Sequence, residues 1–107
     1  MEKMIDILVM YPNRDGMTFD EGYYLNHHIP LAMRLLDDYG LKFIRVAKGA
    51  EHDSPFYLVT YMGFETKEVF NKAIDEVGSE IFEDISKFTN VEPLIQVGEP
   101  VVNDRMP

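Results

Sequence analysis

Four segments of the chain combine apolar, β-branched and aromatic residues with few polar interruptions, which is typical of β-strands. These segments are residues 4–11, 41–48, 56–64 and 91–97. A cluster of turn-forming residues at 12–16 ends the first segment, and the polar stretch 49–55 predicts a hairpin between the second and the third. Pro93 indicates an edge strand or the start of a strand, because proline has no amide hydrogen to donate to a neighbour.

Two other segments repeat their apolar residues with helical spacing. The first covers residues 20–39 and stops at Gly40, a residue suited to the left-handed position just after a helix. Thr66 predicts the cap of a second helix, whose apolar residues run from 69 to 77. We expect Gly78 to close that helix, after which Ser79 caps a short further turn that reaches Ile85.

The order β-α-β-β-α-β predicts one α+β domain over residues 1–107, with a ferredoxin-like, four-stranded antiparallel sheet that carries both helices on one face. In a monomer, the face without helices should be polar at every second strand residue. Both faces are apolar instead. The first strand alternates Ile5, Ile7, Val9 and Tyr11 with Met4, Leu8 and Met10, and the third alternates Phe56, Leu58 and Met62 with Tyr57, Val59 and Tyr61. We therefore expect a homodimer, in which two sheets form a dimeric α/β barrel by packing face to face.

Composition narrows the possible functions. The chain has 19 acidic and 10 basic residues, and its net charge of -9 opposes binding to nucleic acid or to anionic membranes. Cysteine is absent from the sequence, so a disulfide framework, a thiolate metal site and a cysteine nucleophile are excluded. Residues 1–6 contain charges and resemble neither a signal peptide nor a membrane span, which favours a cytoplasmic protein.

The first helix presents a histidine from its apolar face. His28 lies near the centre of an apolar arc of roughly 140°, whereas His27 points about 100° away from it, toward the polar flank. Adjacent helical residues diverge and His52 lies in a predicted loop, so we expect no metal site. Pro30 should bend the helix and free the carbonyl of Asn26.

His28 has two interpretations. It is either a buried histidine satisfied by its neighbours or a general base, and a neutral imidazole suits the second role near pH 7. Burial should lower its pKa, although Asp6, Glu21 or the Asn26 carbonyl would raise that pKa if they lay close. Tyr24, about one turn earlier on the same face, is the second catalytic candidate, because its hydroxyl can hydrogen-bond a substrate oxygen.

Further aromatic and amide side chains can reach the same layer and bind a ligand. They are Tyr11, Asn13, Tyr61, Phe88 and Asn90, with Tyr57 and Gln96 as additional candidates. Core packing is the alternative for the tyrosines, and a simple turn is the alternative for Asn90. The scattered glycines never adopt the spacing of a phosphate-binding loop, so the sequence favours no nucleotide cofactor.

The stretch from Tyr23 to Leu31, which reads tyrosine-tyrosine-leucine and then histidine-x-proline-leucine, resembles the first-helix motif of the EthD family. The histidine of that motif matches His28. Residues 11–13 and 88–96 also resemble the family, so the similarity spans residues 4–102. The family belongs with the dimeric α/β-barrel folds and takes its name from a protein associated with the degradation of ethyl tert-butyl ether.

The resemblance implies the fold more firmly than the reaction, since similar barrels serve as cofactor-free monooxygenases, cyclases, decarboxylase-like enzymes, haem proteins and proteins without known activity. We expect a cofactor-independent enzyme for a small apolar or aromatic molecule, with oxygenase, cyclase or decarboxylase-like chemistry and His28 as general base. One alternative is a non-catalytic ligand-binding or accessory protein of a degradation pathway. The other is a haem-binding barrel protein.

Overall fold

The predicted strands form a single antiparallel sheet in the computed structural model, which describes residues 4–102. The strands are β1 (Ile5–Pro12), β2 (Leu41–Lys48), β3 (Phe56–Phe64) and β4 (Leu94–Gly98). Their order across the four-stranded sheet is β2-β3-β1-β4, with every neighbouring pair antiparallel. The predicted α+β, ferredoxin-like fold is therefore confirmed. Strand β4 begins after Pro93, later than predicted, and pairs only with β1, as an edge strand does.

The first predicted helix is present but has four parts. They are α1 (Glu21–Tyr23), a π-helical turn η1 (Tyr24–His28), α2 (Ile29–Leu36) and a 3-10 turn η2 (Asp37–Tyr39). The Asp20 side chain accepts a hydrogen bond from the Tyr23 amide and so caps the start of α1. Gly40 follows η2 with φ of 81°, the left-handed conformation expected of it.

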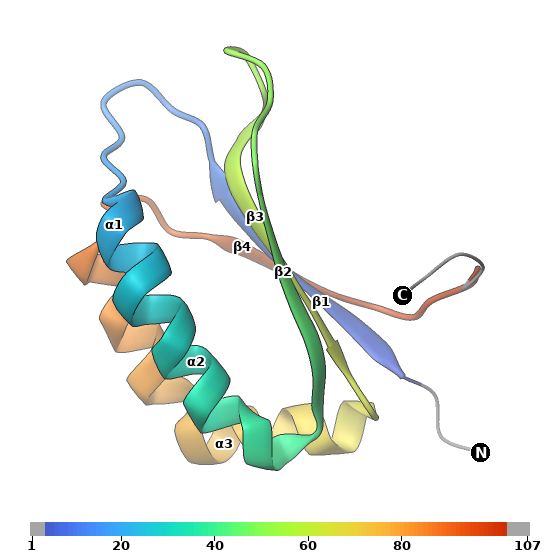
Figure 1. Cartoon of the computed structure of the whole chain (residues 1–107). Helices are drawn as coiled ribbons and strands as arrows, with labels where there is room; N and C mark the ends of the chain where they lie inside the picture. The colour runs from blue at the N-terminus through green and yellow to red at the C-terminus, as the bar shows by residue number, and fades with distance from the viewer. Residues whose placement is uncertain (1–3, 103–107) are drawn as a thin grey trace.

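The wide turn η1 lies directly before Pro30, where the sequence predicts a bend. The Ile29 amide donates to the Tyr24 carbonyl, one residue farther back than in a regular α-helix. Pro30 has no amide hydrogen, and its ring crowds the carbonyl of Asn26 in a regular helix. The wider turn relieves this conflict without ending the helix, which continues through α2 (Figure 1).

The prediction that Gly78 closes the second helix is wrong. Helix α3 (Lys67–Asp84) is continuous over 18 residues and ends in a 3-10 turn, η3 (Ile85–Lys87). Within the described part of the chain, only Gly16 and Gly40 adopt the positive φ that stops a helix at glycine. Gly78 is buried where a Cβ atom would lie 3.1 Å from Ile74 Cγ2, so it permits close packing. The predicted cap is confirmed, since the Thr66 hydroxyl accepts a hydrogen bond from the helix.

Both helical segments cover the same face of the sheet, and the core between them has two parts (Figure 1). An aliphatic cluster surrounds Ile7, Leu36 and Phe64, and an aromatic cluster contains Tyr11, Tyr24 and Phe88. No helix within residues 4–102 has the length and apolar character needed to cross a membrane.

The opposite face of the sheet carries no helix (Figure 1). Apolar side chains lie on it, among them Ala47 and Val59. Phe43 and Tyr61 stack there with ring centroids 5.5 Å apart. Tyr57 is an exception to the predicted alternation. The register of β1 and β3 shifts at Tyr11 and Pro12, and Tyr57 packs on Phe19, 4.9 Å between centroids, on the helix side.

Candidate functional site

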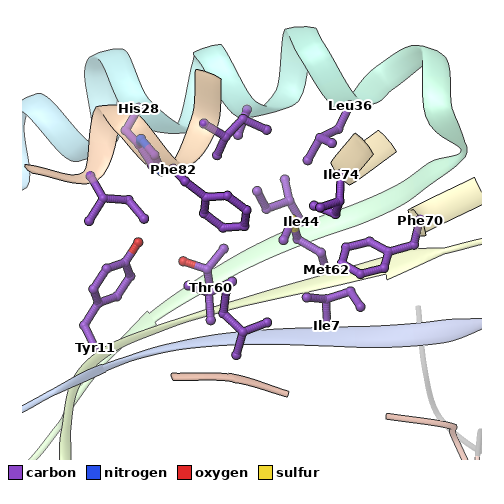
Figure 2. Close-up of a pocket in the computed structure, with 15 residues that line it drawn as sticks. Ile7, Tyr11, His28, Leu36, Ile44, Thr60, Met62, Phe70, Ile74 and Phe82 are labelled. Atoms are coloured by element: carbon purple, nitrogen blue, oxygen red, sulfur yellow. The ribbon is translucent and has the colours of Figure 1, made fainter. Parts of the chain in front are cut away.

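A cavity of about 60 Å³ lies between the helices and the sheet, where the two parts of the core meet (Figure 2). Its wall is almost entirely apolar and includes Ile7, Leu36, Met62, Phe70, Ile74 and Phe82. Three residues on this wall carry polar groups: Tyr11, His28 and Thr60. One water-sized particle needs ~10–15 Å³ of such space, so the cavity accepts several atoms of a small molecule.

His28 is 5% exposed and is held by a buried carboxylate. Its Nδ1 lies 2.8 Å from Oδ2 of Asp84, near the end of α3. The Tyr23 hydroxyl donates to the other carboxylate oxygen of Asp84 at 2.7 Å. Asp84 therefore links both α1 and η1 to α3, and it fixes the plane and the position of the imidazole.

The protonation states follow from burial and from these hydrogen bonds. Burial alone would raise the pKa of the Asp84 carboxyl, but hydrogen bonds from Tyr23 and His28 outweigh burial and hold that pKa below its usual value. Burial lowers the pKa of His28, although the bond to Asp84 and its charge oppose the shift. The predicted direction of the His28 shift agrees with this balance. A neutral His28 beside an ionised Asp84 must donate through Nδ1, which leaves the lone pair on Nε2.

Nε2 of His28 has no hydrogen-bond partner among residues 4–102, and the ring itself lines the cavity (Figure 2). Phe88 packs against the imidazole at 4.6 Å between centroids, and Tyr24 stacks on it at 5.6 Å. The arrangement can therefore accept a proton at Nε2 from a molecule in an apolar setting, while Asp84 stabilises the imidazolium that forms.

Tyr24 packs against His28, but its hydroxyl is already engaged. It shares a hydrogen bond with the Thr60 hydroxyl, and of these two residues only Thr60 lines the cavity. Burial raises the pKa of Tyr24 to about 12, so its hydroxyl is protonated at neutral pH. Tyr24 supports the site through its ring and through Thr60.

Tyr11 and Phe88 join His28 and Tyr24 in one cluster, as the sequence suggested. Tyr11 is 1% exposed, and its hydroxyl is directed into the cavity (Figure 2). Burial, followed by the proximity of Tyr24, raises the pKa of Tyr11 well above its usual range.

Phe88 packs against His28 but does not line the cavity, and the structure does not bring the remaining ligand-binding candidates to it. Asn13 donates to the backbone carbonyls of His52 and Ser54 and fixes the hairpin loop. Asn90 accepts from the Thr18 amide and donates to the Gly16 carbonyl, so it organises two loops. Tyr61 donates to Asp6 at 2.6 Å on the face without helices, and Gln96 is exposed on β4.

The two histidines of the first helix differ as predicted. His27 is exposed and lies against Tyr23, with ring centroids 5.0 Å apart, while His28 is buried. Within residues 4–102, no group of three or more histidine, aspartate and glutamate side chains is placed to bind a metal ion.

Asp84, the partner of His28, was not among the residues predicted from the sequence. The expected break at Gly78 separated Asp84 from the apolar stripe that it continues, through residues 70, 73, 77 and 81 of the same helix. A carboxylate at a position that helical spacing assigns to the core was the signal available, because a buried charge requires a partner.

Phe82 stands between the cavity and the molecular surface. It is 41% exposed and lines both the inner cavity and an outer groove of about 580 Å³. Ile85 and Ile95 also belong to both walls, so the groove between α3 and β4 leads toward the cavity. A ligand that enters by this path passes Phe82.

Comparisons with known proteins agree with this fold. Neither a scan against protein-family models nor a search of curated proteins found a match. Among solved structures, an EthD-like protein from Ralstonia eutropha is 30% identical, covers 98% of each chain and superposes with a TM-score of 0.85. An EthD family protein from Bacillus halodurans is 23% identical over 92% of this chain and 99% of its own, with a TM-score of 0.72.

A third similar structure shows the fold alone. It is SnoaB, a cofactor-independent oxygenase from Streptomyces nogalater, which is 7% identical, covers 97% of this chain and 99% of its own, and has a TM-score of 0.71.

Proposed function

Because this chain belongs to the EthD family, we propose that it is an enzyme that moves protons on a small, mostly apolar organic molecule, with His28 as the general base. The observation that carries the proposal is the pairing of His28 with Asp84 at 2.8 Å on the wall of an apolar cavity. A structural histidine needs only satisfied ring nitrogens. Here one nitrogen is satisfied, and the other has no partner within residues 4–102.

In the proposed step, Nε2 of His28 removes a proton from a carbon or hydroxyl group of the substrate. Asp84 compensates the charge of the imidazolium, and the proton later returns to the product or to water. The lowered pKa of His28 keeps the imidazole neutral near pH 7, so the base is ready before substrate binds. Such a step is common to cyclase, decarboxylase-like and cofactor-independent oxygenase chemistry, and SnoaB supports the last of these as a use of the fold.

The cavity bears on two other functions. A protein that only binds and carries its ligand would use the same cavity, so turnover must be measured separately from binding. A haem-binding protein fits poorly, because a cavity of about 60 Å³ is far too small for a porphyrin ring.

We also propose that the protein works as a homodimer through the face of the sheet without helices. A groove of about 820 Å³ runs over this face, and it is lined by Phe43, Arg45, Ala47, Val59 and Tyr61. Apolar side chains at such positions lose contact with water when a second sheet covers them.

The test of the enzymatic function is hydrogen–deuterium exchange at the acidic carbon of phenylacetone, a small aromatic ketone, followed by NMR in D₂O. We expect the protein to accelerate the exchange, His28→Ala to abolish the acceleration, and His27→Ala to leave it unchanged. Binding of phenylacetone without exchange would instead support the alternative function, a protein that only binds and carries its ligand. Absence of both, or full activity in His28→Ala, would refute the proposed use of the cavity.

A further inference from the structure

We propose that the Tyr11 hydroxyl binds the oxygen atom of the substrate, and that the site accepts an apolar molecule with one enolisable carbonyl or phenolic oxygen. This inference rests on the proposed function and deepens it. Tyr11 lies in β1 opposite Leu58 of β3, 1% exposed, with its hydroxyl in the cavity wall (Figure 2).

The hydroxyl of Tyr11 differs from those of four other tyrosines in the chain. These four each hydrogen-bond a protein side chain: Tyr23 with Asp84, Tyr24 with Thr60, Tyr57 with Glu21 and Tyr61 with Asp6. The remaining tyrosine, Tyr39, is only half-buried. Within residues 4–102 the Tyr11 hydroxyl makes no such bond, although Tyr11 is among the most deeply buried residues. No fully enclosed polar side-chain atom of residues 4–102 lacks a hydrogen-bond partner, so the Tyr11 hydroxyl reaches the free space of the cavity and can donate to a molecule held there.

The Tyr11 ring is held firmly enough to position that hydroxyl. Phe19, Tyr24 and Phe88 meet it edge to face, with centroids 5.3, 6.0 and 5.7 Å away. The strand backbone fixes the other end, through the pairing of β1 with β3. A donor that is already ordered loses little conformational entropy when it binds an oxygen.

His28 and Tyr11 can act on one substrate because both line the same small cavity, with Thr60 on the wall as well (Figure 2). The Tyr11 hydroxyl donates to a carbonyl oxygen while Nε2 of His28 removes a proton from the adjacent carbon. The carbon–hydrogen bond breaks and a nitrogen–hydrogen bond forms. The electron pair of the carbon–hydrogen bond becomes the new carbon–carbon double bond, and the π pair of the carbonyl group moves onto the oxygen. Tyr11 then donates to an enolate, and a hydrogen bond to a charged oxygen is stronger than one to a neutral oxygen.

The cavity wall also indicates which substrates are disfavoured. No lysine or arginine of the described chain lines it, so a carboxylate or phosphate would enter without a cation to pair with. Negative charge is expected to arise only during the reaction, at the oxygen held by Tyr11.

The test compares Tyr11→Phe with Tyr24→Phe, two changes that each remove one buried hydroxyl. We expect Tyr11→Phe to keep or raise the melting temperature, because its hydroxyl has no protein partner to lose. Tyr24→Phe should lower it by several degrees, because Thr60 loses its partner. Equal destabilisation by both changes would assign Tyr11 a structural hydrogen bond and overturn the proposal.

Binding of 4-nitrophenol, read from its absorbance, supplies the second measurement. Tyr11→Phe should weaken binding of 4-nitrophenol by about tenfold or more, whereas Tyr39→Phe, a change away from the cavity wall, should leave it unchanged. Equal affinity in wild type and Tyr11→Phe would overturn the proposal, as would tighter binding of 4-nitrobenzoate than of 4-nitrophenol. If the wild type binds 4-nitrophenol in a Tyr11-dependent way but does not accelerate the exchange of phenylacetone, the catalytic function would be refuted and the Tyr11 oxygen-binding site would be retained.

Discussion

Replacing Asp84 with asparagine tests whether this carboxylate sets the state of His28. The two side chains have nearly the same shape, so the change removes a charge and one acceptor without opening a cavity. An asparagine can accept from only one of the two donors, His28 Nδ1 and the Tyr23 hydroxyl, and must turn its own NH₂ group toward the other.

The expected cost follows from these bonds. One charge-assisted hydrogen bond, at 2.8 or 2.7 Å, becomes a neutral one, and the other is lost. Each change is worth on the order of 1–3 kcal/mol. Part of this lost free energy is offset, because burial penalises the charge of the Asp84 carboxylate and a neutral amide avoids that penalty. We expect a net loss of about 2 kcal/mol and a melting temperature lower by about 10 °C.

The same variant should change His28 itself. Asp84 raises the pKa of His28 against the effect of burial, so Asp84→Asn should lower the pKa of His28 further. Long-range ¹H–¹⁵N NMR spectra of the wild type should show the proton on Nδ1 and a bare Nε2, and the variant should lose this preference.

Asp75→Asn is the matched control, since Asp75 is an exposed residue of the same helix. A melting temperature for Asp84→Asn close to that of Asp75→Asn would refute the stabilising role of the pair. A wild-type proton on Nε2 would refute the proposed base.

Three further outcomes are expected. Because burial lowers the pKa of His28 below 6.5, the unfolded chain takes up a proton at this histidine first on acidification. Through this group, the free energy of unfolding should stay constant above about pH 6.5 and fall below it. Denaturant titrations that show no fall between pH 7 and 5 would contradict this. Phe82→Ala should join the cavity to the groove and improve the affinity for 4-phenylphenol relative to 4-nitrophenol by about tenfold, and an unchanged ratio of dissociation constants would place the path elsewhere. Val59→Asp should convert a dimer into a monomer in light scattering, because each copy would bring a charge to the buried face; a monomeric wild type would remove the proposed interface.

The fold was predictable because its signals are local. Alternation in residues 4–11 and 56–64, the turn clusters, the Thr66 cap and Gly40 each depend on near neighbours in the chain, and their order leaves few possible topologies. The error at Gly78 arose because the local signal of a glycine is ambiguous. The packing of Ile74 against Gly78 shows that this glycine allows close packing and does not end the helix.

The candidate site was predictable only on its helix side. His28 and Tyr24 share a face of one helix, so spacing alone placed them together. The partner Asp84 is distant in sequence, and its pairing depends on how α2 and α3 pack. Asn13 and Asn90 were predicted to bind a ligand, but their side-chain amides join loops instead. The sequence cannot distinguish these two uses of an amide near an expected pocket.

The wide turn η1 gives the first helix one residue more than a uniform α-helix of the same rise would hold. Residues before the turn are thereby rotated out of phase with residues after it, and each half can meet its own neighbours. Tyr24 serves the aromatic cluster, Leu36 serves the aliphatic cluster, and His28 stands at the junction. Deleting a single residue from this turn would regularise the helix yet force its two halves into one rotational setting, so that the aromatic and aliphatic contacts would compete for it.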